Sequence, residues 1–332
     1  MRVHHWYRCA SGRRGEIGAI ALDIRVRNSG QMQNQLVTIF GGGGFLGRYV
    51  CEELLKAGYR IRLAERDPSN AVGIKPMGGL GQTQFVSCDI TRKDGPLRAA
   101  RGSDAIVNLC GAFADRGEAV NRDGAGHVAE AAAELGVGAL IHVSAIGADP
   151  EAESIYGRTK GEGEQRVRSA YPAATIMRPS IVFGPDDNFL NRFAGMIRML
   201  PIVPVIGAKT KFQPVFAGDV AAAIRAAVSE PFVHQGQTYE LGGPEQLSML
   251  ELNRWIAEQI GREPLFVEVP YKAAFALTLG TRWLPSPPIT EDQLVMLKKD
   301  NVVAGGARTL TDLGVEATPL IAIAPDYLVK YR

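Results

Sequence analysis

The sequence predicts an α/β protein with a doubly wound parallel sheet and a smaller, mostly helical C-terminal lobe. Three features of its 332 residues lead to this prediction. An apolar run of β-forming residues at 36–40 leads into a glycine cluster, and a helical pattern starts directly after it. Strand and helix patterns then alternate as far as Arg178-Pro179. Beyond that point the alternation stops, and proline-rich links join helical patterns.

Short apolar runs bounded by turn residues mark the expected strands. They cover 36–40, 60–64, 84–88, 105–110, 139–144, 174–177 and, after the break, 237–241. The helices expected between them cover 45–57, about 119–135 and about 155–170, with Gly58 and Gly136 ending the first two. Repeated strand–helix–strand units imply a parallel sheet with helices on both faces. Right-handed crossovers then make the sheet Rossmann-like.

The second part of the chain is expected to form a separate lobe and to contribute one further strand to the sheet. Residues 186–212 predict a helix and a proline-containing loop, and 216–229 predict another helix. Further helices are expected at 248–260, 271–280 and 291–298. The sheet domain therefore covers 32–185 with about 213–242, and the small substrate or partner lobe covers about 186–212 and 243–332. The lobe should lie over the carboxyl edge of the sheet, where ligands of such sheets bind.

Bulk composition excludes several classes of protein. Hydrophobic residues make up 46% and charged residues 22%, as in ordinary globular domains. A net charge of +2 gives no argument for nucleic acid, and no apolar run approaches the length of a transmembrane segment. The cysteines form no C-x-x-C pair, and Cys51, Cys88 and Cys110 are expected to be reduced core residues of an intracellular protein.

Residues 1–31 differ from the rest of the chain, because six arginines face only Glu16 and Asp23. An arginine-rich, acid-poor segment is typical of an organelle transit peptide, which would place the protein in the mitochondrial matrix. The alternative is a poorly ordered tail or an over-called start, since Met32 lies just before the first strand. In either case the segment takes no part in the predicted fold.

Gly41, Gly44 and Gly47 give the spacing G-x-x-G-x-x-G at the predicted strand–helix turn. The turn needs a residue that can adopt φ > 0, the backbone must approach a pyrophosphate, and the helix must pack on its strand. Side chains obstruct all three. The helix N-terminus would then present N–H groups and a positive dipole end to the phosphates. The alternative is a glycine-rich turn without a ligand, but the flanking strand and helix favour a dinucleotide.

The charged residues after the second strand bear on the choice of dinucleotide. Glu65 can hydrogen-bond the adenosine ribose and repel a 2′-phosphate, whereas the adjacent Arg66 would bind one. NAD(H) and NADP(H) therefore both stay open, and a solvated charged loop would contain the same residues. Asp89 follows the third strand, where it either contacts the adenine amino group or caps the next turn.

Tyr156 and Lys160 lie at positions i and i+4 of a predicted helix and therefore share one face. A tyrosine with its ordinary pKa near 10 is a poor acid–base group at neutral pH. A neighbouring lysine cation is expected to stabilise the phenolate and lower the pKa of Tyr156. Lys160 could also hold a ribose hydroxyl. The pattern Y-x-x-x-K is weak alone, but it is informative on the helix after strand five of such a sheet.

These features together resemble the short-chain dehydrogenase/reductase superfamily, in its extended or atypical branch, over about 36–330. The resemblance rests on Gly41, Gly44, Gly47, Asp89, 108–111, Ser144, Tyr156, Lys160, 178–179 and 184–185. Within the superfamily the chain is similar to the nucleotide-binding accessory subunit of respiratory complex I and its bacterial relatives. The stretches behind this similarity are 75–78, 80–82, 183–191, 211–215, 219–220, 289–292 and 312–319.

The resemblance implies that NADP(H) or NAD(H) contacts a set of residues along one sheet edge. They are Gly41, Gly43, Gly44, Phe45, Leu46, Gly47, Glu65, Arg66, Asp89, Ile90, Leu109, Gly111, Lys160, Pro179 and Ile181. It implies Tyr156, Lys160 and Ser144 as the catalytic set. Ala145 and Ile146 follow Ser144, where many active relatives carry the working hydroxyl, so it stays open whether this set is complete.

Two further groups of residues suggest sites less strongly. His127 and His142 have no second ligand at metal spacing, so no metal site is expected. Five aromatic residues of the small lobe either line a greasy pocket, as for a quinone or lipid, or belong to its core. They are Trp255, Phe266, Tyr271, Phe275 and Trp283.

The sequence leaves two main functions open. The first is a cofactor-holding protein of the complex I accessory-subunit type, which acts with respiratory or quinone-biosynthesis machinery, in the cytoplasm or at the periphery of a bacterial inner membrane. The second is an active NAD(P)-dependent oxidoreductase or an epimerase/dehydratase. There Tyr156 would exchange a proton with a hydroxyl or carbonyl substrate while the nicotinamide exchanges hydride.

Overall fold

The computed structural model describes residues 35–113, 116–281, 283 and 289–332, so the extension 1–31 lies outside the described residues. A seven-stranded parallel sheet has the order β11-β6-β5-β4-β1-β2-β3. Its strands are β1 (Leu36–Phe40), β2 (Arg60–Glu65), β3 (Thr83–Ser87), β4 (Ala105–Asn108), β5 (Ala139–Val143), β6 (Thr175–Pro179) and β11 (Thr238–Leu241). This order confirms the doubly wound Rossmann-like sheet, with its switch point between β1 and β4.

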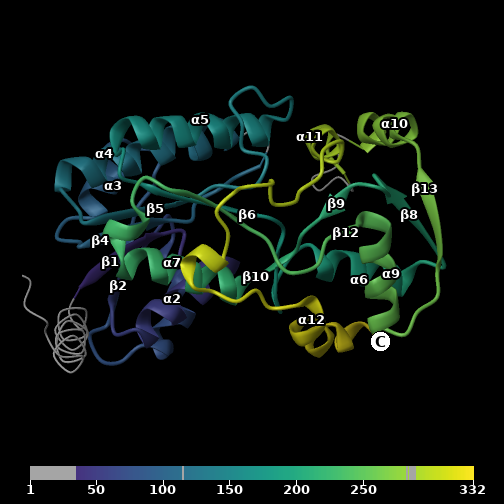
Figure 1. Cartoon of the computed structure of the whole chain (residues 1–332), viewed down its shortest axis with the longest axis horizontal. Coiled ribbons are helices and arrows are strands. Elements are labelled where there is room, and N and C mark those ends of the chain that lie inside the picture. Colours follow the sequence, from purple (N-terminus) through teal and green to yellow (C-terminus); the bar gives the residue numbers. More distant parts are fainter. Residues whose placement is uncertain (1–34, 114–115, 282, 284–288) are drawn as a thin grey trace, which may run out of the picture.

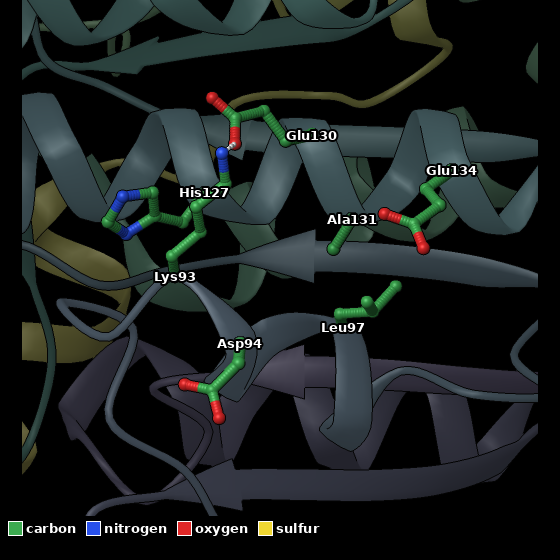
Figure 2. A pocket seen from close by; sticks show the side chains of 7 residues that line it. All are labelled: Lys93, Asp94, Leu97, His127, Glu130, Ala131 and Glu134. Atoms are coloured by element: carbon green, nitrogen blue, oxygen red, sulfur yellow. Dashed lines mark ion pairs between the residues drawn. The ribbon is translucent and has the colours of Figure 1, made fainter.

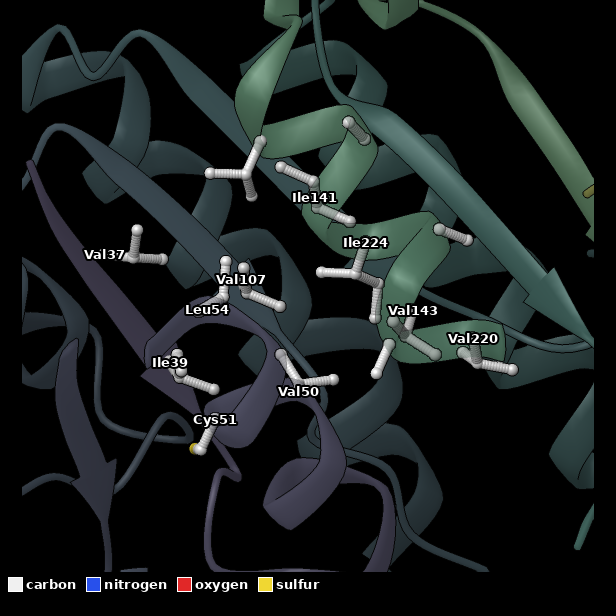
Figure 3. Packing of buried hydrophobic residues seen from close by; sticks show 14 of the residues in the cluster. Val37, Ile39, Val50, Cys51, Leu54, Val107, Ile141, Val143, Val220 and Ile224 are labelled. Carbon is white, nitrogen blue, oxygen red and sulfur yellow. The ribbon is translucent and has the colours of Figure 1, made fainter. Parts of the chain in front are cut away.

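Helices cover both faces of the sheet (Figure 1). One layer contains α2 (Phe45–Lys56) and α7 (Ala217–Ser229), and the other contains α3 (Asp94–Ala99), α4 (Ala125–Leu135) and α5 (Ile155–Ala170). Figure 3 shows the core under the first layer, where Val50 and Leu54 of α2 and Ile224 of α7 meet Ile39 and Val107 of the sheet. The i, i+4 spacing of Val50 and Leu54 directs both side chains to this core.

The strand register brings the predicted site residues to one edge of the sheet. Phe40 at the end of β1 lies beside Ala64 of β2 and Asn108 of β4, and Asn108 lies beside His142 of β5. The segments that follow these strands therefore start at the same edge. They carry the glycine turn, Glu65 and the loop after Asn108, as the sequence predicts.

The second lobe is built from helices and short sheets. Its helices are α6 (Leu190–Met199), α9 (Met249–Gln259), α10 (Tyr271–Thr281), α11 (Glu291–Met296) and α12 (Leu320–Leu328). Two-stranded sheets are formed by β8 (Ile202–Ile206) with β13 (Leu265–Val269), and by β9 (Lys211–Phe212) with β12 (Leu247–Ser248). A third joins β7 (Val182–Phe183) to β10 (Val215–Phe216), beside the large sheet.

Two predictions for the second lobe need correction. The proline-containing loop expected within 186–212 is largely strand β8, and β13 was not expected at all. Pro204 lies inside β8, where the missing N–H is tolerated because a two-stranded sheet consists only of edge strands. In addition, Leu310 and Leu313 pack into the core of the large sheet, so the division at residue 243 needs an exception around them.

Three smaller features complete the architecture. The helix expected from 119 begins as a π-helical turn, η3 (Glu118–Gly124), before α4. Short helical segments occur at η1 (Pro68–Met77), α8 (Pro231–His234), η4 (Thr311–Leu313) and η5 (Val329–Tyr331). Gly58 and Gly136 have positive φ angles of 89° and 62° after α2 and α4, which confirms both as helix terminators.

Candidate functional site

The glycine turn between β1 and α2 has the geometry that the spacing predicts. Gly41 has φ of +83°, which L side chains rarely adopt. A Cβ atom on Gly47 would lie 2.3 Å from the carbonyl oxygen of Gly42, so only glycine lets α2 pack this closely on the turn. Gly44 has an ordinary φ of −74°, and a Cβ there would have 3.5 Å to its nearest neighbour. Two of the three glycines are thus required by the fold, whereas Gly44 is not.

The N-terminus of α2 has no side chain to cap it. Gly44 is its N-cap residue and makes no side-chain hydrogen bond. By contrast, Ser154, Ser248 and Thr290 accept backbone N–H bonds at the starts of α5, α9 and α11. The first amides of α2, on Phe45 and Leu46, therefore suit an anionic group such as a pyrophosphate. The turn fits a dinucleotide on this ground.

The side chain of Glu65 hydrogen-bonds the backbone of the glycine turn. The amide of Gly43 donates a hydrogen bond of 2.6 Å to Oε1 of Glu65. Burial raises the pKa of Glu65, although this hydrogen bond and the charge of Arg66 act in the opposite direction. Arg66 itself is exposed next to Glu65. An acid thus faces the turn, and a neighbouring arginine lies in solvent.

The carboxylate of Asp89 is hydrogen-bonded within its own turn. One of its oxygens accepts hydrogen bonds from the amide of Thr91 at 3.0 Å and from its hydroxyl at 2.8 Å. These bonds lower the pKa of Asp89. This is the turn-capping arrangement that the sequence offers as the alternative to adenine contact. Ile90 beside it is buried, and a Cβ on Gly124 would lie only 2.7 Å from its side chain, so Ile90 could offer only its backbone to a ligand.

The loop after β4 is held by a buried amide–imidazole pair. The amide nitrogen of Asn108 lies 3.2 Å from Nδ1 of His142, and its oxygen accepts the backbone N–H of Cys110 at 3.1 Å. Since the amide group can only donate from nitrogen, Nδ1 of His142 is the acceptor and Nε2 carries the proton. Burial lowers the pKa of His142 to about 3, so the ring stays neutral. Together with the hydrogen bond from the Leu109 amide to the Phe40 carbonyl, this pair fixes the backbone at Leu109 and Cys110.

Lys160 and Tyr156 do not form the predicted acid–base pair. The ammonium of Lys160 donates a hydrogen bond of 3.1 Å to the carbonyl of Val143, and its pKa falls to about 8 because it is buried. Burial raises the pKa of Tyr156 to about 12. The expectation that Lys160 lowers this pKa is therefore wrong for this structure. The Tyr156 ring instead stacks on Phe113, with ring centroids 4.3 Å apart.

Ser144 follows β5 directly, one residue past the end of the observed strand, and is only 4% exposed. Its hydroxyl has no hydrogen-bond partner among the residues that the structure describes, and the same holds for Nε2 of His142. Both side chains occupy alternate positions along this segment and so face the same side of the sheet. Because a buried polar group without a partner is costly, this pair suits a polar ligand atom or a bound water.

Three polar residues that sequence reasoning missed organise this site. The side chain of Asn121 bonds both backbone groups of Ala112 at 2.8 and 2.9 Å, and also the hydroxyl of Thr159. Asp292 of α11 accepts the first amides of α5 at 2.5 and 3.1 Å. Asn301 accepts the hydroxyl of Ser180 on its side-chain oxygen at 2.6 Å. The contacts of Asp292 and Asn301 join segments far apart in the chain, which no local pattern reveals.

The remaining predicted residues have mainly structural contacts. Leu46 packs into the sheet core, and Phe45 contacts the ring of Tyr49 edge-on with centroids 5.7 Å apart. Pro179 ends β6, where its carbonyl accepts the amide of Ile146 at 3.1 Å. Ile181 packs against the core of the second lobe.

A separate surface pocket of about 370 Å³ lies over α3 and α4 (Figure 2). Lys93, Asp94, Leu97, His127, Glu130, Ala131 and Glu134 line it. Lys93 and Glu130 face each other across 3.6 Å, and none of the predicted site residues lies in this pocket. Among the described residues no group of metal-binding side chains is found, and no described helix has both the length and the apolar character needed to cross a bilayer.

Comparison with known proteins matches the chain to one family. The model of the NAD dependent epimerase/dehydratase family matches residues 37–242. The mitochondrial NADH dehydrogenase (ubiquinone) 1 alpha subcomplex subunit 9 of Mus musculus is 34% identical, over 90% of this chain and 80% of that protein. The subunit of the same name from Arabidopsis thaliana is 33% identical, over 90% of this chain and 78% of that protein.

Solved structures share the fold at low sequence identity. An NADPH-dependent quinone oxidoreductase from Escherichia coli, complexed with NADPH, superposes with a TM-score of 0.70 at 18% identity, over 88% of this chain and 99% of that one. A triphenylmethane reductase from Citrobacter, complexed with NADP(H), gives a TM-score of 0.70 at 17% identity, over 89% and 98%. These likenesses concern the fold alone.

Proposed function

The chain belongs to the NAD dependent epimerase/dehydratase family, and from this membership we propose that it holds a nicotinamide dinucleotide without turning it over. The pyrophosphate would lie on the uncapped amides at the start of α2, with Glu65 and Arg66 at the adenosine end. The nicotinamide end would reach the loop at Gly111 and the edge near Lys160. Both NADP(H) and NAD(H) are compatible with this arrangement.

The proposed holding function rests on the contacts that the side chains of Tyr156 and Lys160 make. The ammonium of Lys160 donates to the Val143 carbonyl and the Tyr156 ring stacks on Phe113, and among the described residues no hydrogen bond joins the two head groups. Burial also raises the pKa of Tyr156, away from the working pH that suits a proton-transferring group. The site therefore supports binding better than it supports catalysis. The same dinucleotide chemistry serves an accessory subunit that is stabilised by its cofactor.

The relatives named as NADH dehydrogenase (ubiquinone) subunits indicate the partner class. We propose that this chain associates with respiratory or quinone-biosynthesis machinery, and that its second lobe supplies the partner surface. Its location would be the periphery of a bacterial inner membrane or, in the alternative, the mitochondrial matrix.

Mass spectrometry of nucleotide released from the purified protein tests the binding step. We expect a stoichiometric dinucleotide that survives purification. Affinity capture of the full chain from membranes in mild detergent tests the partner step, and complex I or quinone-biosynthesis subunits are the expected co-purifying proteins. A protein that yields no nucleotide and gives no calorimetric heat with any nicotinamide dinucleotide would contradict the proposal.

One observation favours an active oxidoreductase or epimerase/dehydratase as the second candidate. The buried hydroxyl of Ser144 lacks a partner in the described structure and lies at the same sheet edge as Lys160. A substrate oxygen bound there would complete a hydrogen-bond set. In that case Tyr156→Phe would abolish turnover of the substrate and spare dinucleotide binding, whereas the holding function predicts that this variant behaves as the wild type in every assay.

A further inference from the structure

Helix α10 of the second lobe is apolar on all sides. Its sequence, from Tyr271 to Thr281, contains a single charged residue, Lys272, and only Ala274 and Thr278 are buried. The side chains of Phe275, Leu277 and Leu279 are 44–48% exposed. An ordinary surface helix confines its apolar residues to the stripe that faces the core. Tyr271, Phe275 and Trp283, expected in a pocket or core, are therefore surface residues.

Helix α9 of the same lobe shows the ordinary pattern at equal length. It buries Leu252 and Ile256 and exposes Glu251, Arg254 and Glu258. The contrast shows that the exposed face of α10 does not result from a shortage of core in this lobe. A monomeric protein rarely exposes a contiguous apolar patch of this kind unless the patch has a partner.

The outer face of the β8–β13 sheet continues the apolar surface. Ile202 pairs with Leu265, and Pro204 pairs with Val267, so these four side chains lie on one face of the sheet. All four are exposed. The next pair on that face, Ile206 and Val269, packs under Ala274 of α10. Helix and strands thus form one surface at the end of the lobe away from the large sheet (Figure 1). We call it the apolar face.

Every polar side chain on α10 apart from Lys272 finds its partner within the chain. The hydroxyls of Thr278 and Thr281 donate to carbonyls of their own helix, at 2.7 and 2.8 Å. The indole N–H of Trp283 donates to Gly280 and the hydroxyl of Tyr271 to Leu297. The apolar side chains of this face can therefore leave water without burying an unpaired donor from Tyr271, Thr278 or Thr281.

We propose that the apolar face docks on the interfacial layer of a phospholipid bilayer. The α10 helix has 11 residues and so spans roughly 16 Å, too short to cross a bilayer. Tyr and Trp side chains favour the headgroup level. Lys272 is exposed beside Tyr271, and the exposed Lys299 lies two residues beyond Leu297, whose carbonyl accepts the Tyr271 hydroxyl. These cations suit anionic headgroups.

Co-sedimentation of the full chain with vesicles of phosphatidylcholine and phosphatidylglycerol tests the proposal. We expect the wild type to bind, and the double variant Phe275→Ser/Leu279→Ser to lose roughly tenfold or more in partition coefficient through the lost apolar contact. The matched control is Phe232→Ser, since Phe232 is 86% exposed on α8, away from the apolar face, and this variant should bind as the wild type does. The emission of Trp283 should shift to the blue on vesicle addition, and Trp283→Phe should remove the shift.

Three results would overturn the inference: a wild type that stays in the supernatant, a double variant that binds vesicles normally, or a wild-type dimer that the double variant dissociates. The last result would make the face an interface between copies. The inference does not depend on the dinucleotide site. Dinucleotide affinity measured on the same samples separates the two proposals and also confirms that the double variant is folded.

Discussion

The substitution Gly44→Ala should weaken dinucleotide binding while leaving the stability of the fold nearly unchanged. Gly44 has φ of −74°, and a Cβ on it would stand 3.5 Å from the Gly41 oxygen, an ordinary contact. Alanine is a weaker N-cap than glycine, but it also lowers the entropy of the unfolded chain. These two effects nearly cancel, so we expect the free energy of unfolding to change by less than about 1 kcal/mol. A bound pyrophosphate, by contrast, would meet the added methyl group directly.

The expected loss concerns the hydrogen bonds to the phosphates. Displacing the pyrophosphate weakens at least one charged hydrogen bond from the first amides of α2, which is worth about 1.5–3 kcal/mol. That corresponds to a rise in the Kd for the dinucleotide of roughly 10- to 100-fold. Gly47→Ala behaves differently, because its Cβ would stand 2.3 Å from the Gly42 oxygen. It should destabilise the fold itself by about 1–3 kcal/mol.

Isothermal titration calorimetry with each nicotinamide dinucleotide measures the affinity, and urea unfolding measures the stability of the same preparations. Gly73→Ala is the matched control, since no atom lies within 4 Å of its added methyl group and it stands outside the turn. Unchanged affinity in a stably folded Gly44→Ala variant would refute the placement of the pyrophosphate at this helix start.

Three further predictions concern charged groups around the site. Arg66→Ala should lower the NADPH-to-NADH affinity ratio and Glu65→Ala should raise it, each by roughly tenfold in parallel titrations; shifts in the same direction would contradict the assigned roles. Lys160 has its pKa lowered from 10.5 to about 8, so the unfolded chain binds more protons between these values. The wild type should therefore gain up to about 3 kcal/mol of stability as the pH rises through this window, relative to Lys160→Met, in urea unfolding; parallel pH profiles would exclude this burial. Asp292→Asn should cost about 1–2 kcal/mol and speed hydrogen exchange at Ile155 and Tyr156 roughly tenfold or more, whereas exchange unchanged at these amides would show that the cap contributes nothing.

The sheet domain could be predicted because its information is local. A buried parallel strand is a short apolar run, and the glycines at 41, 58 and 136 mark turns that few other residues allow. Each predicted strand was found to within two residues. The π-helical turn before α4 escaped prediction because it depends on Asn121, which bonds Ala112 and Thr159 on other segments. Strand β8 escaped because Pro204 signals a loop unless its edge position is known.

At the site, local sequence likewise does not predict which way a single side chain points. The i, i+4 spacing correctly places Tyr156 and Lys160 on one helix face, but the direction of each head group is set by residues outside the helix. Lys160 turns to the Val143 carbonyl, and the Tyr156 ring turns to Phe113. Neither partner is encoded in the Y-x-x-x-K pattern, so the pattern predicts location and not ionisation.

The second lobe also bears on whether this chain holds or transforms its cofactor. Asp292 binds the first amides of the helix that carries Tyr156, and Asn301 bonds Ser180 directly after β6. On the sheet side, both oxygens of Asp219 accept hydrogen bonds from Thr318. A catalytic crevice that admits and releases substrate usually needs a mobile element above it. Here hydrogen bonds tie the lobe to the start of α5, to the segment after β6 and to α7. If these bonds hold the lobe in place, dinucleotide release should be slow, which stopped-flow displacement of bound dinucleotide would measure; Asp292→Asn should then speed release.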